Sequence, residues 1–395
     1  MSEPTEFQKA WQRFRRNRPA FAGLSFVLLS ILVAIFGYGL SPDQAPDANT
    51  QIPSLALTAP GARAQLLSVK LNRWVQPVSY ASLLISGRPV TDLLIPIVPG
   101  SLRLERDSVY FQPIGDVGQQ GSVHVLQLFF PVFEELITDT TAYIFKDATG
   151  LVQRISKAHL VDNIKKGMVV SSRYFVLGTD KYGRCNYSRL LLGCRVSLLV
   201  GLISVFISLT IGLFLGLVGG YFGGKLDEVV LLLINTAWSI PTLLLVFAIV
   251  MALGRGVGII FLAVGLTMWV DVARMVRGQT LSLRSLPFVE AAQSMGFGHW
   301  RILRRHILPN LLGPVLVLAA GNFATAILVE SGLSYLGFGV QPPTPSWGSM
   351  LNENYGYAIS GKPLLALAPA IAIALMVLAF NLVGNGLRDA LDVKG

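Results

Sequence analysis

The chain has 395 residues, of which 52% are hydrophobic and 14% charged. Soluble proteins carry about 25% charged residues, so this composition argues against an ordinary soluble enzyme and predicts an integral membrane protein. The net charge of +10 lies in segments that flank apolar runs, so we interpret it as a sign of membrane orientation and not of nucleic-acid binding.

The N-terminal segment predicts a membrane anchor. Residues 1–20 are basic, and residues 21–40 form an uncharged run. A cleaved signal peptide has an apolar core of roughly 7–15 residues and a small-residue cleavage site. This run is longer and is followed by SPDQAPD. We therefore predict a cytoplasmic N-terminus and a retained transmembrane helix over 21–40.

Residues 41–175 differ from the rest of the chain, because they are polar and nearly balanced in charge. Alternation of apolar and polar residues at 122–130 and 140–145 predicts strands. Turn signals at Pro99-Gly100 and Gly118–Gly121 separate such stretches. We expect a soluble, β-containing insert on the extracytoplasmic side.

Six runs are long enough to cross the ~30 Å of hydrocarbon in a bilayer as helices. After the first at 21–40, the runs in the core region 176–395 are 196–220, 229–253, 257–276, 313–335 and 363–386. The predicted fold class is an all-α membrane protein with six transmembrane helices, with the β-containing insert between the first and the second.

The basic residues predict the orientation of these spans. The segment 277–312 contains five arginines, and Arg388 and Lys394 lie at the C-terminus. Basic residues favour the cytoplasmic side, so both termini and 277–312 are expected in the cytoplasm.

The segment 277–312 is too long and too ordered for a simple connection. Pro287 suits the first turn of a helix, Gly296 and Gly298 predict a break, and a second helix is expected over 299–308. Two explanations stay open on physical grounds. The segment either binds another cytoplasmic protein or lies on anionic membrane lipid.

Several motifs resemble those of one family. The Glu-Ala-Ala sequence at 290–292, followed by Gly296, His306 and Leu308-Pro309-Asn310, is similar to the EAA loop of ABC-importer permeases. The stretches LGTDKYGRCNYSRLLLGCRVSL (177–198), GGYFGGKLDE (219–228), ILVESGLSYLGFGVQPPTPSWGSML (327–351) and AFNLVGNGLRDALD (379–392) resemble the peptide/nickel branch, in particular oligopeptide and dipeptide permease "C" subunits.

The resemblance implies a role for the loop and a set of partners. In the family, this loop is a coupling helix that sits in a cleft of a cytoplasmic ATPase. The residues that match it are Glu290, Ala291, Ala292, Gly296, His306, Leu308 and Pro309. The implied partners are a second homologous permease subunit, two cytoplasmic ABC ATPase subunits and an extracytoplasmic solute-binding protein.

This sequence departs from the family pattern at three places. Cys185 stands where the branch usually has Asp, and Asn235 stands where the third span often has Asp. The insert 41–175 is longer than the usual link, and the resemblance does not extend to it. Two roles for the insert therefore stay open: it either contacts the binding protein or is structural.

Polar residues inside predicted spans are candidates for the translocation path, because polar groups are costly in lipid. Glu330 either lines the path or pairs within the helix bundle, and Asp271 is expected to pair with Arg274. Asn235, Trp238, Asn322 and Asn381 are weaker candidates.

Three other features of the sequence have simple structural explanations. Gly212, Gly216 and Gly220 form a stripe for close helix packing, either within this chain or against another subunit. Cys185 and Cys194 are expected to be ordinary small residues, with a bridge open only if that stretch is not helical. The sequence GGYFGGK at 219–225 matches the start of a phosphate-binding loop, but it lacks the Ser or Thr that follows and the strand that precedes such a loop.

The sequence thus predicts a multi-pass permease subunit of an ATP-driven importer in the bacterial inner membrane, for peptides or related small solutes. We expect no catalytic residues, cofactor or metal site in this chain, because ATP hydrolysis belongs to the partner subunits. The alternative is a membrane-anchored sensor or scaffold whose insert binds an external ligand.

Overall fold

The computed structural model describes residues 6–73, 75, 79–115, 118–139 and 141–391. Residues 1–5 of the predicted N-terminus, Thr140 of one predicted strand, and Asp392 and Lys394 at the C-terminus lie outside the described residues. The chain divides into two compact units. A helical unit comprises Met1–Ala34 and Gly193–Gly395, and an insert unit comprises Ile35–Leu192.

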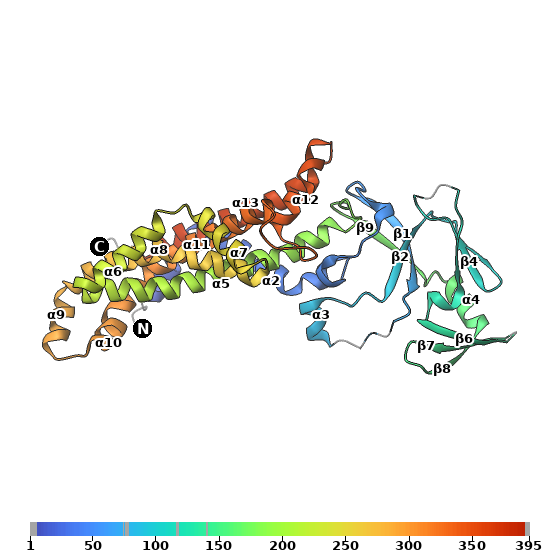
Figure 1. The fold of residues 1–395 in the computed structure, drawn as a ribbon, viewed down its shortest axis with the longest axis horizontal. Helices are drawn as coiled ribbons and strands as arrows, with labels where there is room; N and C mark the ends of the chain where they lie inside the picture. Colours follow the sequence, from blue (N-terminus) through green and yellow to red (C-terminus); the bar gives the residue numbers. More distant parts are fainter. Residues whose placement is uncertain (1–5, 74, 76–78, 116–117, 140, 392–395) are drawn as a thin grey trace. The chain divides into compact units, whose positions relative to one another are not determined.

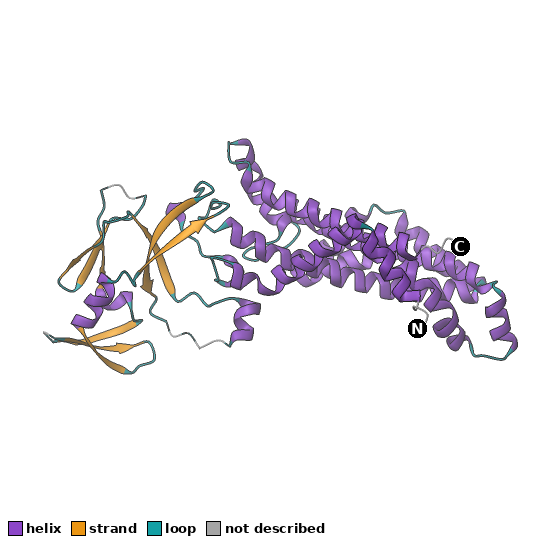
Figure 2. Ribbon diagram, turned by 180° about the vertical axis from the view of Figure 1, so that it is seen from behind, coloured by secondary structure: helices purple, strands orange, loops and turns teal. Residues whose placement is uncertain are grey.

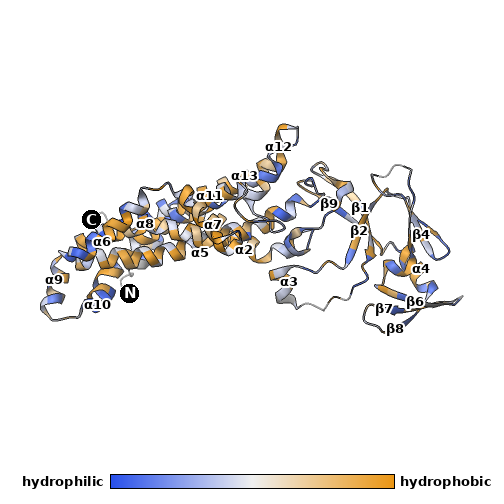
Figure 3. Ribbon diagram, viewed as in Figure 1, coloured by the Kyte–Doolittle hydropathy of each residue, from blue (hydrophilic) through white to orange (hydrophobic). Residues whose placement is uncertain are grey.

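Most of each membrane-spanning helix belongs to the helical unit (Figures 1 and 2). Among the residues that the structure describes, five helical stretches are long and apolar enough to cross a membrane, and a bent pair of helices can form a sixth span. The five are α2 (Arg18–Leu40), α5 (Asn186–Phe222), α8 (Val257–Arg284), the stretch from His299 through α11 (Leu308–Tyr335), and α13 (Leu364–Leu391). Hydrophobic residues extend along them in Figure 3. The remaining helices of this unit are α1 (Glu6–Arg16), α6 (Gly224–Trp238), α7 (Thr242–Leu253), α9 (Pro287–Ser294), α10 (His299–Ile302) and α12 (Trp347–Ile359). The predicted fold class is confirmed.

The run 229–253, expected as one straight span, is two helices in the structure. Helices α6 and α7 are bent by 89° at the break between them. Pro241 lies in this break, just before Thr242. Proline has no N–H to donate and disfavours a helical conformation at the preceding residue, here Ile240. The apolar composition of 229–253 predicted a segment long enough to span the membrane, but it did not predict the break at Pro241.

The glycine stripe of α5 packs against α8 within the chain. A Cβ added to Gly212 would clash with Val272 Cβ, and one added to Gly216 would lie 2.7 Å from Val276 Cβ. At Gly220 it would lie 2.8 Å from Thr280 Cβ. The backbones of α5 and α8 therefore approach more closely than they could if these positions carried side chains. Of the two alternatives, packing within this chain is confirmed.

The insert unit is built from three antiparallel three-stranded sheets, with orders β2-β1-β9, β3-β4-β5 and β6-β7-β8. The strands are β1 (Ala62–Lys70), β2 (Asp92–Ile97), β3 (Arg103–Glu105), β4 (Ser108–Phe111), β5 (Gly121–His124), β6 (Val132–Thr138), β7 (Ala142–Asp147), β8 (Val152–Ser156) and β9 (Val170–Phe175). The unit also contains the α-helices α3 (Tyr80–Ser86) and α4 (Lys157–Lys165) and short 3-10 helices over Pro46–Ala48, Pro53–Leu55 and Val125–Leu128. The predicted β-containing insert is confirmed.

One core joins these strands to α4. It includes Leu67 of β1, Val109 of β4, Phe145 of β7 and Leu160 of α4, all almost fully buried. In β4, burial alternates along the strand, as expected for a sheet with one face on the core. A cross-strand ion pair joins Lys70 Nζ to Asp92 Oδ1 at 2.8 Å, where β1 and β2 pair.

The strand predicted over 122–130 is only partly present. Strand β5 ends at His124, and a short 3-10 helix follows over Val125–Leu128. Val125 and Leu126 are both buried, whereas a strand sends successive side chains to opposite faces. Packing on the core therefore overrides the local alternation.

Both cysteines are free and buried. Cys185 comes directly before α5 and Cys194 lies within that helix. The prediction that they are ordinary small residues is confirmed.

Candidate functional site

The connection between α8 and α11 is a helix–turn–helix. Helix α9 begins at Pro287, a residue whose missing N–H costs nothing at a first helical position. Glu290 lies in the first turn, where a carboxylate interacts favourably with the helix dipole. Gly296 has a φ of +76°, so it turns the chain out of the helix at a position where a side chain would be strained. These local preferences define the turn before α10.

This connection is anchored on one side and exposed on the other. Val289 and Ala292 of α9 are fully buried in a core shared with Val272 of α8 and Ile307. Glu290 and Ala291 are exposed. Glu290 makes no ion pair among the residues that the structure describes. An anchored helix therefore presents an unpaired carboxylate and a small residue to its surroundings.

The second half of the connection runs continuously into α11. A π-helical turn over Leu303–Ile307 joins α10 to α11. Pro309 has no N–H to give to the carbonyl four residues earlier, which favours a shifted hydrogen-bond register before it. His306 is half-buried and stacks on Phe297, with ring centroids 6.1 Å apart. Leu308, half-buried, and Pro309, exposed, are the first residues of α11.

Side-chain contacts tie the connection to α5. The hydroxyl of Tyr221 lies 3.1 Å from Nδ1 of His299, which joins the end of α5 to the start of α10. Both rings also contact Phe222 edge to face. Movement of α9 and α10 is therefore coupled to α5 as well as to α8 and α11.

Helix α6 is fastened to α8 by two arginines. Arg277 donates two hydrogen bonds to the carboxylate of Asp227, one of them from Nη2 to Oδ2 at 2.6 Å. The guanidinium of Arg274 lies over the ring of Trp238, 4.0 Å from its centroid. The expected pairing of Arg274 with Asp271 is wrong, because Arg274 contacts Trp238 and the described structure has no ion pair between the two residues.

The four residues predicted for the translocation path do not form one surface within this chain. Asn235 and Trp238 of α6 are exposed, and Trp238 keeps 62% of its area accessible. Glu330 and Asn322 of α11 are buried. The Glu330 carboxylate accepts a 2.7 Å hydrogen bond from the Ser334 hydroxyl, which also accepts one from the backbone N–H of Val340.

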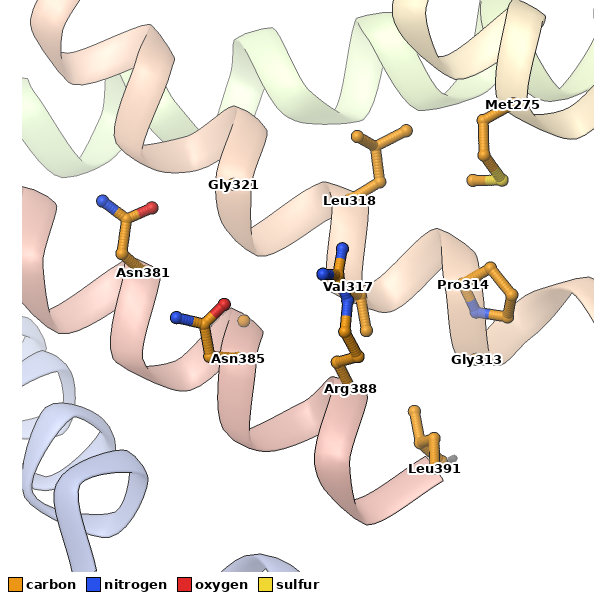
Figure 4. Close-up of a pocket in the computed structure, with 11 residues that line it drawn as sticks. Met275, Gly313, Pro314, Val317, Leu318, Gly321, Asn381, Asn385, Arg388 and Leu391 are labelled. Carbon is orange, nitrogen blue, oxygen red and sulfur yellow. The ribbon is translucent and has the colours of Figure 1, made fainter. Parts of the chain in front are cut away.

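A cavity of about 490 Å³ lies between α8, α11 and α13 (Figure 4). On α13 it is lined by Asn381, Asn385 and Arg388, which are four and three residues apart and so share one helical face. In Figure 4 the Arg388 side chain extends from α13 toward α11, where Gly313 and Gly321 leave space. Polar groups are costly in lipid, so three polar side chains on one face of a span make this face a candidate functional surface.

Sequence reasoning placed no emphasis on this face. Asn381 was a weak candidate, and Asn385 and Arg388 were not candidates for the path at all. The signal in the sequence is their spacing, which places all three on one helical face. It is visible only if the helix is extended beyond the apolar run 363–386, because Arg388 follows the end of that run.

Comparison with known proteins identifies the family. Residues 208–394 match the family described as binding-protein-dependent transport system inner membrane component. Residues 5–60 match the N-terminal TM domain of oligopeptide transport permease C. The glutathione transport system permease protein GsiD of Pectobacterium atrosepticum is 43% identical over 218 residues, which are 55% of this chain and 72% of that protein. The chain belongs to this family of importer permeases.

The permease has further relatives and structural neighbours. GsiD of Shigella flexneri serotype 5b is 44% identical over 233 residues, covering 59% of this chain and 76% of that protein. A solved structure of the MetNI methionine ABC transporter in inward-facing conformations has a TM-score of 0.43 and 22% identity, covering 51% of this chain and 96% of that one.

These matches confirm the predicted membership of the peptide/nickel branch of ABC-importer permeases. The permease is a multi-pass inner-membrane protein of a transport family. The two matched family segments leave residues 61–207 uncovered, which include most of the insert.

Proposed function

We propose that the permease forms the solute path of an importer together with a second, homologous permease chain. Two cytoplasmic ATPase subunits drive it, and an extracytoplasmic binding protein delivers the solute. ATP is hydrolysed in the ATPase subunits and not in this chain. The family description, which names dependence on a binding protein, supports this assembly.

The observation that carries the proposal is the anchored connection between α8 and α11. Glu290 and Ala291 are exposed, while Val289 and Ala292 are fixed in the core that joins α8 to α11. An ATPase that holds the exposed face moves both spans when it changes conformation. Such a rigid contact shifts the balance between inward-open and outward-open states.

Within the predicted coupling set, each residue has a proposed task. Glu290 is the charged contact to the ATPase, and Ala291 and Ala292 keep the helix narrow. Gly296 sets the turn, and His306, Leu308 and Pro309 set the angle between the connection and α11.

The solute is proposed to be a small peptide-like molecule. The GsiD relatives are named for glutathione transport. In this chain, the guanidinium of Arg388 suits a carboxylate, and the amides of Asn381 and Asn385 suit peptide groups, which both donate and accept hydrogen bonds. Of the earlier candidates, Asn235 and Trp238 stay proposed lining residues, whereas Glu330 and Asn322 are proposed to support the path from within the bundle.

The assembly is tested by purifying the tagged permease in mild detergent and identifying the bound subunits by mass spectrometry. We expect ATPase subunits, a second permease and, after solute addition, a binding protein. Energised vesicles from the same cells are expected to take up a radiolabelled tripeptide. A permease that purifies without an ATPase, from cells that lack such uptake, contradicts the proposal and favours the sensor alternative.

Both termini are proposed to be cytoplasmic and the insert extracytoplasmic. The two native cysteines are buried, so background labelling is expected to be low. The variant Gln120→Cys is therefore expected to react with a membrane-impermeant maleimide in intact spheroplasts. The control Glu228→Cys, at an exposed position in the first half of α6, is expected to react only after lysis. The reverse pattern contradicts this orientation.

A further inference from the structure

An apolar groove lies beside the π-helical turn, apart from the cavity of Figure 4. Its volume is about 250 Å³. One wall is Phe214, Leu217 and Val218 of α5, and the other contains Leu303 and Leu308. Trp300 and Arg304 supply its polar groups.

The groove lies at the ends of two candidate membrane spans. Both walls belong to helices that are long and apolar enough to cross a bilayer. Trp300 keeps 67% of its area accessible although it lies beside apolar residues. Tryptophan is enriched at the depth of lipid headgroups, because its ring is apolar and its indole N–H donates a hydrogen bond.

The charge around the groove is positive and unpaired. Arg304 is exposed and has no ion pair among the residues that the structure describes, and the same holds for Arg305. Glu290 is the single acidic residue of the sequence segment 277–312. An occupant with an apolar chain and a phosphate matches both parts of this site, because guanidinium and phosphate form strong paired hydrogen bonds.

We propose that this groove binds an anionic phospholipid from the leaflet on the side of the 277–312 connection. One acyl chain lies between α5 and the start of α11, and Arg304 binds the phosphate beside Trp300. Because Leu303 and Arg304 belong to the π-helical turn that leads into α11, the bound lipid holds this turn in place.

The test uses the full-length permease purified alone, so its outcome does not depend on an ATPase partner. Thermal unfolding is measured in nanodiscs of phosphatidylcholine with an increasing fraction of phosphatidylglycerol, and retained lipid is counted by native mass spectrometry. Soluble glycerol phosphate serves as a separate arm. We expect phosphatidylglycerol to raise the unfolding temperature and to remain bound, and glycerol phosphate to do neither.

Two variants address the two halves of the site. Arg304→Gln removes the charge, and Val218→Trp fills the groove. Each is expected to weaken phosphatidylglycerol retention about tenfold, the effect of about 1.4 kcal/mol. The control Arg284→Gln removes another exposed arginine, the last residue of α8, and is expected to retain the lipid.

Three results overturn the proposal. The first is equal stabilisation by phosphatidylcholine and phosphatidylglycerol. The second is unchanged phosphatidylglycerol retention in both variants. The third is loss of a co-purified ATPase from Arg304→Gln with lipid retention intact, which assigns the groove to a protein contact instead.

Discussion

Lysine in place of Glu290 is expected to abolish ATP-driven solute uptake while the permease still folds and inserts. The exposed carboxylate is the proposed contact to the ATPase, and reversal of its charge places like charges against each other at that surface. Truncation of one partner in a buried charge pair costs about 2–5 kcal/mol at an interface, which corresponds to more than about tenfold in affinity. The measurements are uptake into energised vesicles and ATPase subunits recovered with the tagged permease.

The local effect of this substitution on the helix is smaller. A lysine in the first turn of α9 opposes the helix dipole, which costs about 0.3–1 kcal/mol. Two variants distinguish this cost to the helix from loss of the contact between Glu290 and the ATPase. Glu290→Gln removes the charge without reversing it and is expected to reduce uptake less. Glu228→Lys makes the same reversal at another exposed position and is expected to leave uptake intact. Normal uptake by Glu290→Lys refutes the contact.

The sequence predicted the helices of this fold well, because a span has to be apolar over its whole length. It also predicted the first helix of the connection and the turn after it, since Pro287 and Gly296 act through local backbone preferences that need no knowledge of the neighbours. The break at Pro241 was missed. Hydropathy averages over a window, and one proline inside a long apolar run does not change that average.

Features that depend on contacts between distant residues were not predictable in the same way. Arg274 had an acidic residue three positions away, yet its partner is the ring of Trp238 on another helix. The polar face of α13 lines a cavity whose other walls come from α8 and α11, where Gly313 and Gly321 have no side chains. In the insert, Val125 and Leu126 are both buried because a core formed by three sheets accepts them together.

The closeness of α5 and α8 leads to the second large effect. The variant Gly216→Leu is expected to lose most of its folded, monodisperse protein. A Cβ at this position would lie 2.7 Å from Val276 Cβ and 2.8 Å from the backbone oxygen of Ala273. A flexible side chain can move away, but a helix backbone cannot, so the two spans have to separate. Overpacking of this kind costs about 1–3 kcal/mol and occasionally more.

That cost is large for a domain with about 5–15 kcal/mol of total stability, and each kcal/mol lowers the unfolding temperature by about 2–4 °C in a domain of 150–250 residues. The matched control is Gly278→Leu on α8, where an added Cβ meets no atom within 4 Å. Leucine also favours helix over glycine, so this control is expected to fold at least as well as the parent chain. Fluorescence-detected size exclusion and thermal unfolding of both variants measure the difference. Equal yields and unfolding temperatures for the two variants contradict the close approach of α5 and α8, because only at Gly216 does the added side chain meet a neighbouring backbone.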